Sequence, residues 1–168
     1  MLTPALVDRY RGFLFWLGRQ DWFNWLGPRL FTPLDTWLYP RTHGAVVSAG
    51  PPVLPLLMLT TLGRLSDRDR TVPLLYMRRG DDLIVVGSNW ARAHHPGWSE
   101  NLLANAGCSV KIGRSTHRAR ARLLPADEAD ALWPSLEAFC PVWRTYRERS
   151  GRELRVFVLR RERPAQAG

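Results

Sequence analysis

The chain has 168 residues and a formal net charge of +9. This length corresponds to one domain of ordinary size, which can bury a core without disulfide or metal staples. Arginine carries almost all of the positive charge, because Lys111 is the only lysine. No recognition helix, RNP-like strand or zinc-finger spacing accompanies the arginines, so we expect no nucleic acid as a partner.

Cysteine and histidine usage bears on location and chemistry. Cys108 and Cys140 lie far apart and match neither a metal-binding nor a thioredoxin spacing. We expect both to be reduced, small apolar residues of a cytoplasmic protein, so any redox chemistry must come from a bound cofactor. His94 and His95 are adjacent and point apart, without a partner at metal-ligand spacing, so we predict no metal site.

The N-terminal segment is predicted to be helical and amphipathic. Apolar residues recur at helical spacing over residues 6–17. Residues 32–35, Thr-Pro-Leu-Asp, resemble an N-cap, a first-turn proline and an early acidic residue, which predicts the start of another helix there. We expect residues 1–40 to form this helical segment and residues 41–168 a barrel, within one structural domain.

Aromatic residues mixed with arginine leave two interpretations of this segment open. A helix on an anionic membrane would place such residues at the lipid headgroups. A helix packed across the barrel, or against a dimer partner, would use the same stripe to contact protein. We favour packing against protein, and keep peripheral contact with the inner face of the cell membrane as the alternative.

Six short apolar runs bounded by turn residues predict six β-strands. They span residues 54–61, 71–77, 83–86, 109–112, 117–124 and 154–159. Helical stretches are predicted after Pro96, Pro125 and Pro141. The fold class is therefore mainly β with added helices (α+β), arranged as a small, partly antiparallel barrel and not as alternating βαβ units.

Polar donors cluster in the middle of the chain. Arg64, Arg68 and Arg70 lie in a turn between the first two strands, where their guanidinium groups can fork onto phosphate or carboxylate oxygens. The alternative is a merely solvated turn, since arginine-rich loops are common in a basic chain. Ser88 and Asn89 stand directly at the exit of the third strand.

A helix N-terminus near Gly97 and Trp98 offers backbone N–H groups to the same kind of anion. Trp90 and Trp98 could flank a flat ring, or could simply be core residues. Donors of three kinds thus converge, which predicts a site for an anionic ligand that carries a ring.

Several spaced motifs in this region occur in a specific order: LTTLGR, then R-x-x-P-L-L-Y, then R-x-G-D-D-x-x-V-V-G-S-N-W, then HHPGW-x-x-NLLAN. Over about residues 34–162 the chain resembles the deazaflavin-dependent nitroreductase and quinone reductase family. The resemblance implies a split β-barrel, FMN-binding-like and related to flavin reductases. It also implies hydride transfer from reduced coenzyme F-420 to a quinone, a nitroaromatic compound or an activated alkene.

The resemblance also implies roles for particular residues. The cofactor-binding set would be Arg64, Ser66, Arg68, Arg70, Pro73, Ser88, Asn89, Trp98 and Asn101. Ser88 and Tyr146 would be catalytic, and Trp143 with Tyr146 would form the wall of the substrate pocket. Tyr146 could donate a proton to a reduced acceptor oxygen; the alternative is a core tyrosine whose hydroxyl is already satisfied.

The sequence departs from the family pattern at two places. A lysine after the Gly-Arg pair and a glycine soon after it are replaced here by Leu65 and Asp67. This change removes one cation and adds one anion beside the expected phosphate site. A glycine pair after the third strand is replaced by Trp90 and Ala91, which would narrow the pocket.

Two other classes of function stay open from the sequence. One is a non-catalytic carrier of F-420 or of a flavin, with FMN or FAD as the alternative cofactor. The other is a membrane-surface protein in which the site is vestigial. By analogy with proteins of this fold, we expect a homodimer that acts on a small-molecule acceptor.

Overall fold

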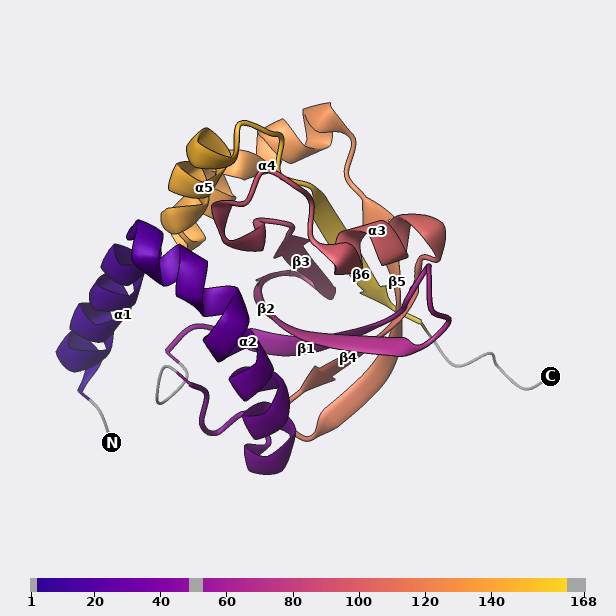
Figure 1. The fold of residues 1–168 in the computed structure, drawn as a ribbon, viewed down its shortest axis with the longest axis horizontal. Coiled ribbons are helices and arrows are strands. Elements are labelled where there is room, and N and C mark those ends of the chain that lie inside the picture. The colour runs from indigo at the N-terminus through magenta and orange to yellow at the C-terminus, as the bar shows by residue number, and fades with distance from the viewer. Residues whose placement is uncertain (1–2, 49–52, 163–168) are drawn as a thin grey trace.

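The computed structural model describes residues 3–48 and 53–162. In these residues six strands close into one antiparallel barrel with the neighbour order β1-β2-β3-β6-β5-β4 (Figure 1). The strands are β1 (Leu56–Leu62), β2 (Asp69–Arg79), β3 (Asp82–Val86), β4 (Gly107–Ile112), β5 (Ser115–Leu123) and β6 (Val156–Arg161). The predicted split β-barrel is confirmed, and each predicted strand overlaps an observed one.

The side chains of β5 alternate between the barrel interior and the solvent. Ala119 and Ala121 are buried in the interior, whereas the arginines at positions 118, 120 and 122 are exposed. The barrel interior contains mostly aliphatic side chains and Phe157, which is 1% exposed. A second apolar core lies outside the barrel wall, where β3 and β6 pack against the C-terminal helices. Both faces of β3 are therefore buried, which accounts for its unbroken apolar sequence.

Helices cover the barrel on two sides. Among the described residues they are α1 (Pro4–Gly18), α2 (Asp21–Thr42), α3 (Gly97–Ala104), α4 (Ala126–Phe139) and α5 (Val142–Ser150), with one short 3-10 turn, η1 (Asn89–Ala91). Figure 1 shows α2 crossing beside β1 and β2, with α1 outside it and with α4 and α5 grouped together away from β4. Across the described part of the chain, no helix combines the length and apolar character needed to cross a membrane.

The predicted start of a helix at residues 32–35 was wrong. Helix α2 runs without a break through Pro28, Pro33 and Pro40, and the Thr36 hydroxyl donates to the Thr32 carbonyl oxygen at 2.8 Å. Each internal proline removes one backbone hydrogen bond. Tertiary contacts offset that loss, because the inner face of α2 packs against β2 and η1.

Tyr39 fastens the end of α2 to the barrel. Its side chain is 3% exposed, its hydroxyl donates to the Leu56 carbonyl oxygen at 2.9 Å, and it accepts from the Gly113 backbone N–H at 3.1 Å. The first of these partners opens β1 and the second lies in the β4–β5 turn. The N-terminal helices are therefore packed against the barrel, as the favoured interpretation expected.

Candidate functional site

One cavity of about 720 Å³ lies where the barrel, α3, α5 and the N-terminal helices meet. The barrel and α3 contribute its more polar side, lined by Gly63, Arg64, Ser66, Arg70, Pro73, Ser88, Asn89, Gly97, Trp98 and Asn101. The helices α1, α2 and α5 contribute a mainly apolar side, lined by Leu14, Phe15, Phe23, Pro28, Val142, Trp143 and Tyr146, with Thr32 and Asp35 of α2 as polar members. The cavity is thus polar at one side and apolar at the other.

The β1–β2 turn is a tight backbone structure that carries the arginines. Gly63 donates its N–H to the Arg68 carbonyl oxygen at 2.9 Å and accepts from the Asp67 N–H at 2.8 Å. A Cβ at position 63 would stand 2.6 Å from the Ser66 hydroxyl oxygen and 3.1 Å from the Arg68 carbonyl oxygen, so a side chain there would displace Ser66 and crowd the turn. The turn leaves Arg64 exposed at the edge of the cavity, where its charge is available to a ligand.

Asn101 of α3 holds this turn in place. Its side-chain oxygen accepts from the Arg64 backbone N–H at 3.1 Å, and its side-chain nitrogen donates to the Thr61 hydroxyl at 3.0 Å. Both Asn101 and Thr61 are buried. Although Asn101 lines the cavity, its amide therefore acts first as a positioning group for Arg64.

The exit of β3 has an unusual backbone. Asn89, Trp90 and Ala91 have φ values of 48°, 56° and 58°, in the left-handed region that favours glycine. The side-chain nitrogen of Asn89 donates to the His94 carbonyl oxygen at 2.8 Å. Among the described residues the Ser88 hydroxyl has no hydrogen-bond partner, so it is available to a ligand.

Arg152 holds this loop in its conformation, a role that sequence patterns did not predict. Its guanidinium donates to the carbonyl oxygens of Gly87 at 3.0 Å, Ser88 at 3.2 Å and Arg92 at 3.1 Å, and lies 3.0 Å from His95 Nδ1. Burial lowers the pKa of Arg152, yet the four contacts keep its donors occupied. The residue follows Gly151, about sixty positions after the loop, so no local pattern could connect the two.

Trp98 belongs mainly to the barrel core. It is 7% exposed, and its ring lies 5.6 Å from that of Phe157, tilted by 59°. The first backbone donor inside α3 is Ser99, which bonds the Pro96 carbonyl oxygen at 3.0 Å. Gly97 and Trp98, whose N–H groups precede it, both line the cavity, and a helix N-terminus favours an anion.

Tyr146 connects α5 to the N-terminal helices. Its hydroxyl donates to the Asn24 side-chain oxygen at 2.6 Å, and the Asn24 side-chain nitrogen donates to the Gly18 carbonyl oxygen at 3.0 Å. Burial raises the pKa of the Tyr146 phenol above its usual value. In this arrangement the phenolic proton is directed at Asn24, and Trp143 beside it is buried against Phe139.

The predicted site residues are largely brought together. The shared cavity wall includes every one of them except Arg68, whose side chain is exposed outside the wall and whose carbonyl oxygen closes the turn. Sequence reasoning missed Arg152, Asn24 and the inner faces of α1 and α2. These groups act through contacts between distant parts of the chain.

Comparison with known proteins identifies the family. The sequence profile of the F-420H(2)-dependent quinone reductase family matches residues 32–161. The chain belongs to this family. An F-420H(2)-dependent quinone reductase of Mycobacterium tuberculosis is 30% identical over 127 residues, which cover 74% of this chain and 85% of the relative. The resemblance predicted from the spaced motifs is confirmed.

Two solved structures are similar to this chain. An F-420-H2-dependent reductase shares 28% identity with a TM-score of 0.57, covering 62% of this chain and 93% of its own. A protein described as a domain-swapped dimer shares 27% identity with a TM-score of 0.58, covering 74% of this chain and 97% of its own.

The family match begins inside α2. Helix α1 and the first half of α2 precede residue 32, yet Phe15 and Phe23 from these parts line the cavity. The apolar side of the cavity thus includes residues outside the stretch that the family profile matches.

Proposed function

We propose that the cavity binds reduced coenzyme F-420 and that the chain catalyses hydride transfer from it to a quinone or a similar small electrophile. The observation that carries this proposal is the meeting of Arg64, Ser88 and the α3 N-terminus at one cavity, in a chain of the F-420H(2)-dependent quinone reductase family. When bound, reduced F-420 supplies a hydride, and a quinone becomes a hydroquinone by accepting that hydride and one proton.

The charges at the cavity suit a flat ring with an anionic tail. Arg64 and Arg70 supply two guanidinium groups, and α3 adds the partial positive charge of its N-terminus. Asp35 is the acidic side chain at the wall. It accepts from the Ser48 backbone N–H at 2.5 Å, so its carboxylate already has a partner within the chain. The polar side therefore attracts phosphate and carboxylate groups, while the apolar side excludes water from a ring.

Individual residues have distinct proposed roles. Arg64, Ser66 and Arg70 bind the phosphate and acidic tail. Ser88 and Asn89 bind the polar edge of the ring, and Pro73 and Trp98 form the apolar wall. Asn101 holds the Arg64 backbone, and Arg68 contributes its charge from outside the wall. Trp143 and Tyr146 limit the space for the acceptor.

Ser88 and Tyr146 are the residues we propose to handle the proton. The Ser88 hydroxyl, which has no hydrogen-bond partner in the described part of the chain, supports its role, whereas Tyr146 must first release its bond to Asn24. Ser88→Ala and Tyr146→Phe test the two roles separately. A fall in kcat at unchanged KM supports proton donation, and unchanged kcat for a variant removes that residue from the chemical step.

Side-by-side titration of the purified chain with F-420, FMN and FAD tests the cofactor assignment. We expect F-420 to bind most tightly, because the site offers two arginines to a long anionic tail. Stopped-flow oxidation of reduced F-420 with quinones and nitroaromatic compounds then tests catalysis. Binding without turnover would favour the carrier alternative, and no binding would favour a vestigial site.

A homodimer remains our prediction for the assembly. The relative described as a domain-swapped dimer supports it. Sedimentation equilibrium of the full chain tests it directly, and a monomer at all concentrations would exclude it.

A further inference from the structure

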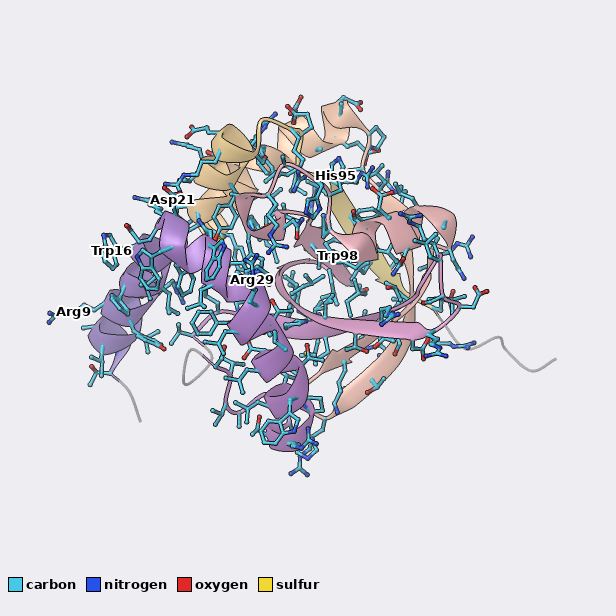
Figure 2. The ribbon with its side chains drawn as sticks, in the orientation of Figure 1. Arg9, Trp16, Asp21, Arg29, His95 and Trp98 are labelled. Atoms are coloured by element: carbon cyan, nitrogen blue, oxygen red, sulfur yellow. The ribbon has the colours of Figure 1, made fainter. Side chains whose placement is uncertain are left out.

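The outer face of α1 carries an exposed apolar stripe. Leu6, Arg9, Phe13 and Trp16 recur three or four positions apart and therefore lie along one side of the helix. Phe13 is 51% and Trp16 54% exposed, and their rings stack with centroids 6.0 Å apart. Figure 2 shows Arg9 and Trp16 projecting from the outer side of α1, away from the barrel.

The outer face of α2 also carries exposed aromatic side chains together with arginines. Trp22, Trp25 and Trp37 are 57%, 62% and 54% exposed. The guanidinium of Arg29 lies 4.4 Å from the centre of the Trp25 ring, and that of Arg41 lies 4.3 Å from the centre of the Trp37 ring. Two indoles on this face are thus each covered by a cation at the surface.

Exposed tryptophan is confined to these two helices. The four exposed tryptophans of the described residues are Trp16, Trp22, Trp25 and Trp37, whereas the other four are buried or half-buried. Scattered apolar side chains at a surface need no explanation, but four large aromatic rings together on one structural unit do. Tryptophan and arginine are the residues that settle at the boundary between lipid tails and headgroups.

Charge favours a lipid surface over a second copy of the chain. In the described part of the chain no salt bridge engages Arg9, Arg29 or Arg41. Of the acidic side chains on α1 and α2, Asp21 is paired with Arg149 at 2.9 Å and Asp35 accepts from the Ser48 backbone N–H, which leaves Asp8 as the one acidic side chain of these helices without such a contact. In a two-fold contact each face would meet its own copy, so like charges would oppose one another. Anionic headgroups would neutralise these arginines instead.

We propose that the outer faces of α1 and α2 form a docking surface for an anionic membrane. The inner faces of the same helices line the cavity through residues such as Phe15 and Phe23. A membrane bound to one side of these helices would therefore stand next to the apolar side of the cavity. An acceptor dissolved in the bilayer then reaches the cavity past α1 and α2, and this second step rests on the proposed function.

Vesicle sedimentation of the full-length protein tests the docking surface. One vesicle set contains phosphatidylcholine alone, and the other contains equal parts of phosphatidylcholine and phosphatidylglycerol. We expect binding to the anionic vesicles that weakens at high salt, and much weaker binding to the neutral ones. Equal binding to both sets, or binding to neither, overturns the proposal.

Two pairs of variants separate the aromatic and the cationic contributions. Trp16→Ala/Trp25→Ala should reduce the partition coefficient roughly tenfold or more, since both rings would insert at the interface. Arg9→Gln/Arg29→Gln should reduce it by about twenty-five-fold, at about fivefold for each arginine near the surface. Unchanged partitioning of both variants would assign vesicle binding to another surface.

Matched controls come from exposed residues elsewhere. Leu103→Ala/Leu123→Ala and Arg118→Gln/Arg120→Gln remove comparable groups on α3 and β5, and should leave partitioning unchanged. Sedimentation velocity without lipid tests the competing occupant. A wild-type dimer that Trp16→Ala/Trp25→Ala converts to a monomer, without any vesicle binding, would make this face a contact between copies and overturn the proposal.

Kinetics separate this proposal from the proposed function. With reduced F-420, the Trp16→Ala/Trp25→Ala variant should lose rate towards a long-chain quinone held in anionic vesicles but keep its rate towards a short, water-soluble quinone. Equal loss with both quinones would overturn the delivery step. If neither quinone is reduced by the wild-type chain, the proposed function fails while the sedimentation result still decides the docking surface.

Discussion

Gly27 of α2 leaves the space that the indole of Trp90 fills. A Cβ placed on Gly27 would stand 2.3 Å from the nearest ring atom of Trp90, which is closer than any real contact. The ring of Phe23 lies 5.7 Å from the same indole. Trp90, one of the residues that replace the glycine pair of the family pattern, therefore joins the cofactor-side loop to the N-terminal helices.

Gly27→Ala should destabilise the protein by about 1–3 kcal/mol, because overpacking would force Trp90 or α2 to move. Urea unfolding followed by circular dichroism measures this loss. Gly12→Ala is the matched control, since no atom lies within 4 Å of a Cβ at that helical position. We expect it to be neutral or stabilising by up to about 1 kcal/mol. Equal effects of the two substitutions would contradict the packing of Trp90 on Gly27.

Replacing either cavity arginine should weaken F-420 binding. Arg64→Ala and Arg70→Ala each remove a charged hydrogen-bond donor, so we expect the Kd to rise by about ten- to a hundredfold. Fluorescence titration with F-420 measures the change. Arg118→Ala on the outer face of β5 should leave the Kd unchanged, and wild-type affinity of both cavity variants would refute this location of the anionic tail.

Much of the barrel could be predicted because its signals are local. Apolar runs and turn residues specify strands within a few positions of each other, and α3 starts just after Pro96, as expected. The turn that carries Arg64 followed from the polar sequence between two such runs. Convergence of this turn with Ser88 at one cavity was predicted from the donor groups at the turn, the strand exit and the helix start, and the family motifs then pointed to the same residues.

The parts that escaped prediction depend on distant contacts. Tyr146 bonds Asn24 across 122 positions, and Arg152 holds Ser88 across 64 positions. No periodicity or spacing encodes such pairs. The continuation of α2 through Pro33 was missed for the same reason, because packing of its inner face on the barrel overrides a local signal that normally starts a helix.

The left-handed backbone at Ala91 predicts a stabilising substitution. An alanine with a φ of 58° costs about 1–2 kcal/mol relative to a residue without a Cβ. Ala91→Gly should therefore raise the free energy of unfolding by about 1 kcal/mol and the Tm by about 2–4 °C. Thermal unfolding measures both. Ala131→Gly, in the middle of α4, should lower stability by about 1 kcal/mol, and a fall for both variants would argue against strain at Ala91.

His95 should make stability depend on pH. Burial, followed by the nearby charges of Arg155 and Arg152, lowers the pKa of His95 below its ordinary 6.5, although Glu100 opposes this shift. The unfolded chain therefore takes up a proton at a higher pH than the folded chain does. The contribution of His95 to stability is complete above about pH 6.5 and is lost as the pH falls through the lowered pKa.

Urea unfolding at a series of pH values between about 5 and 7.5 measures this loss. In His95→Gln the free energy of unfolding should depend less steeply on pH, because the titrating group beside Arg152 is gone. Burial also lowers the pKa of His117, so that residue adds a loss of the same sign. His117→Gln should keep the part of the pH dependence of stability that His95 causes. An unaltered pH profile in His95→Gln would show that the contact of His95 with Arg152 does not govern stability in this range.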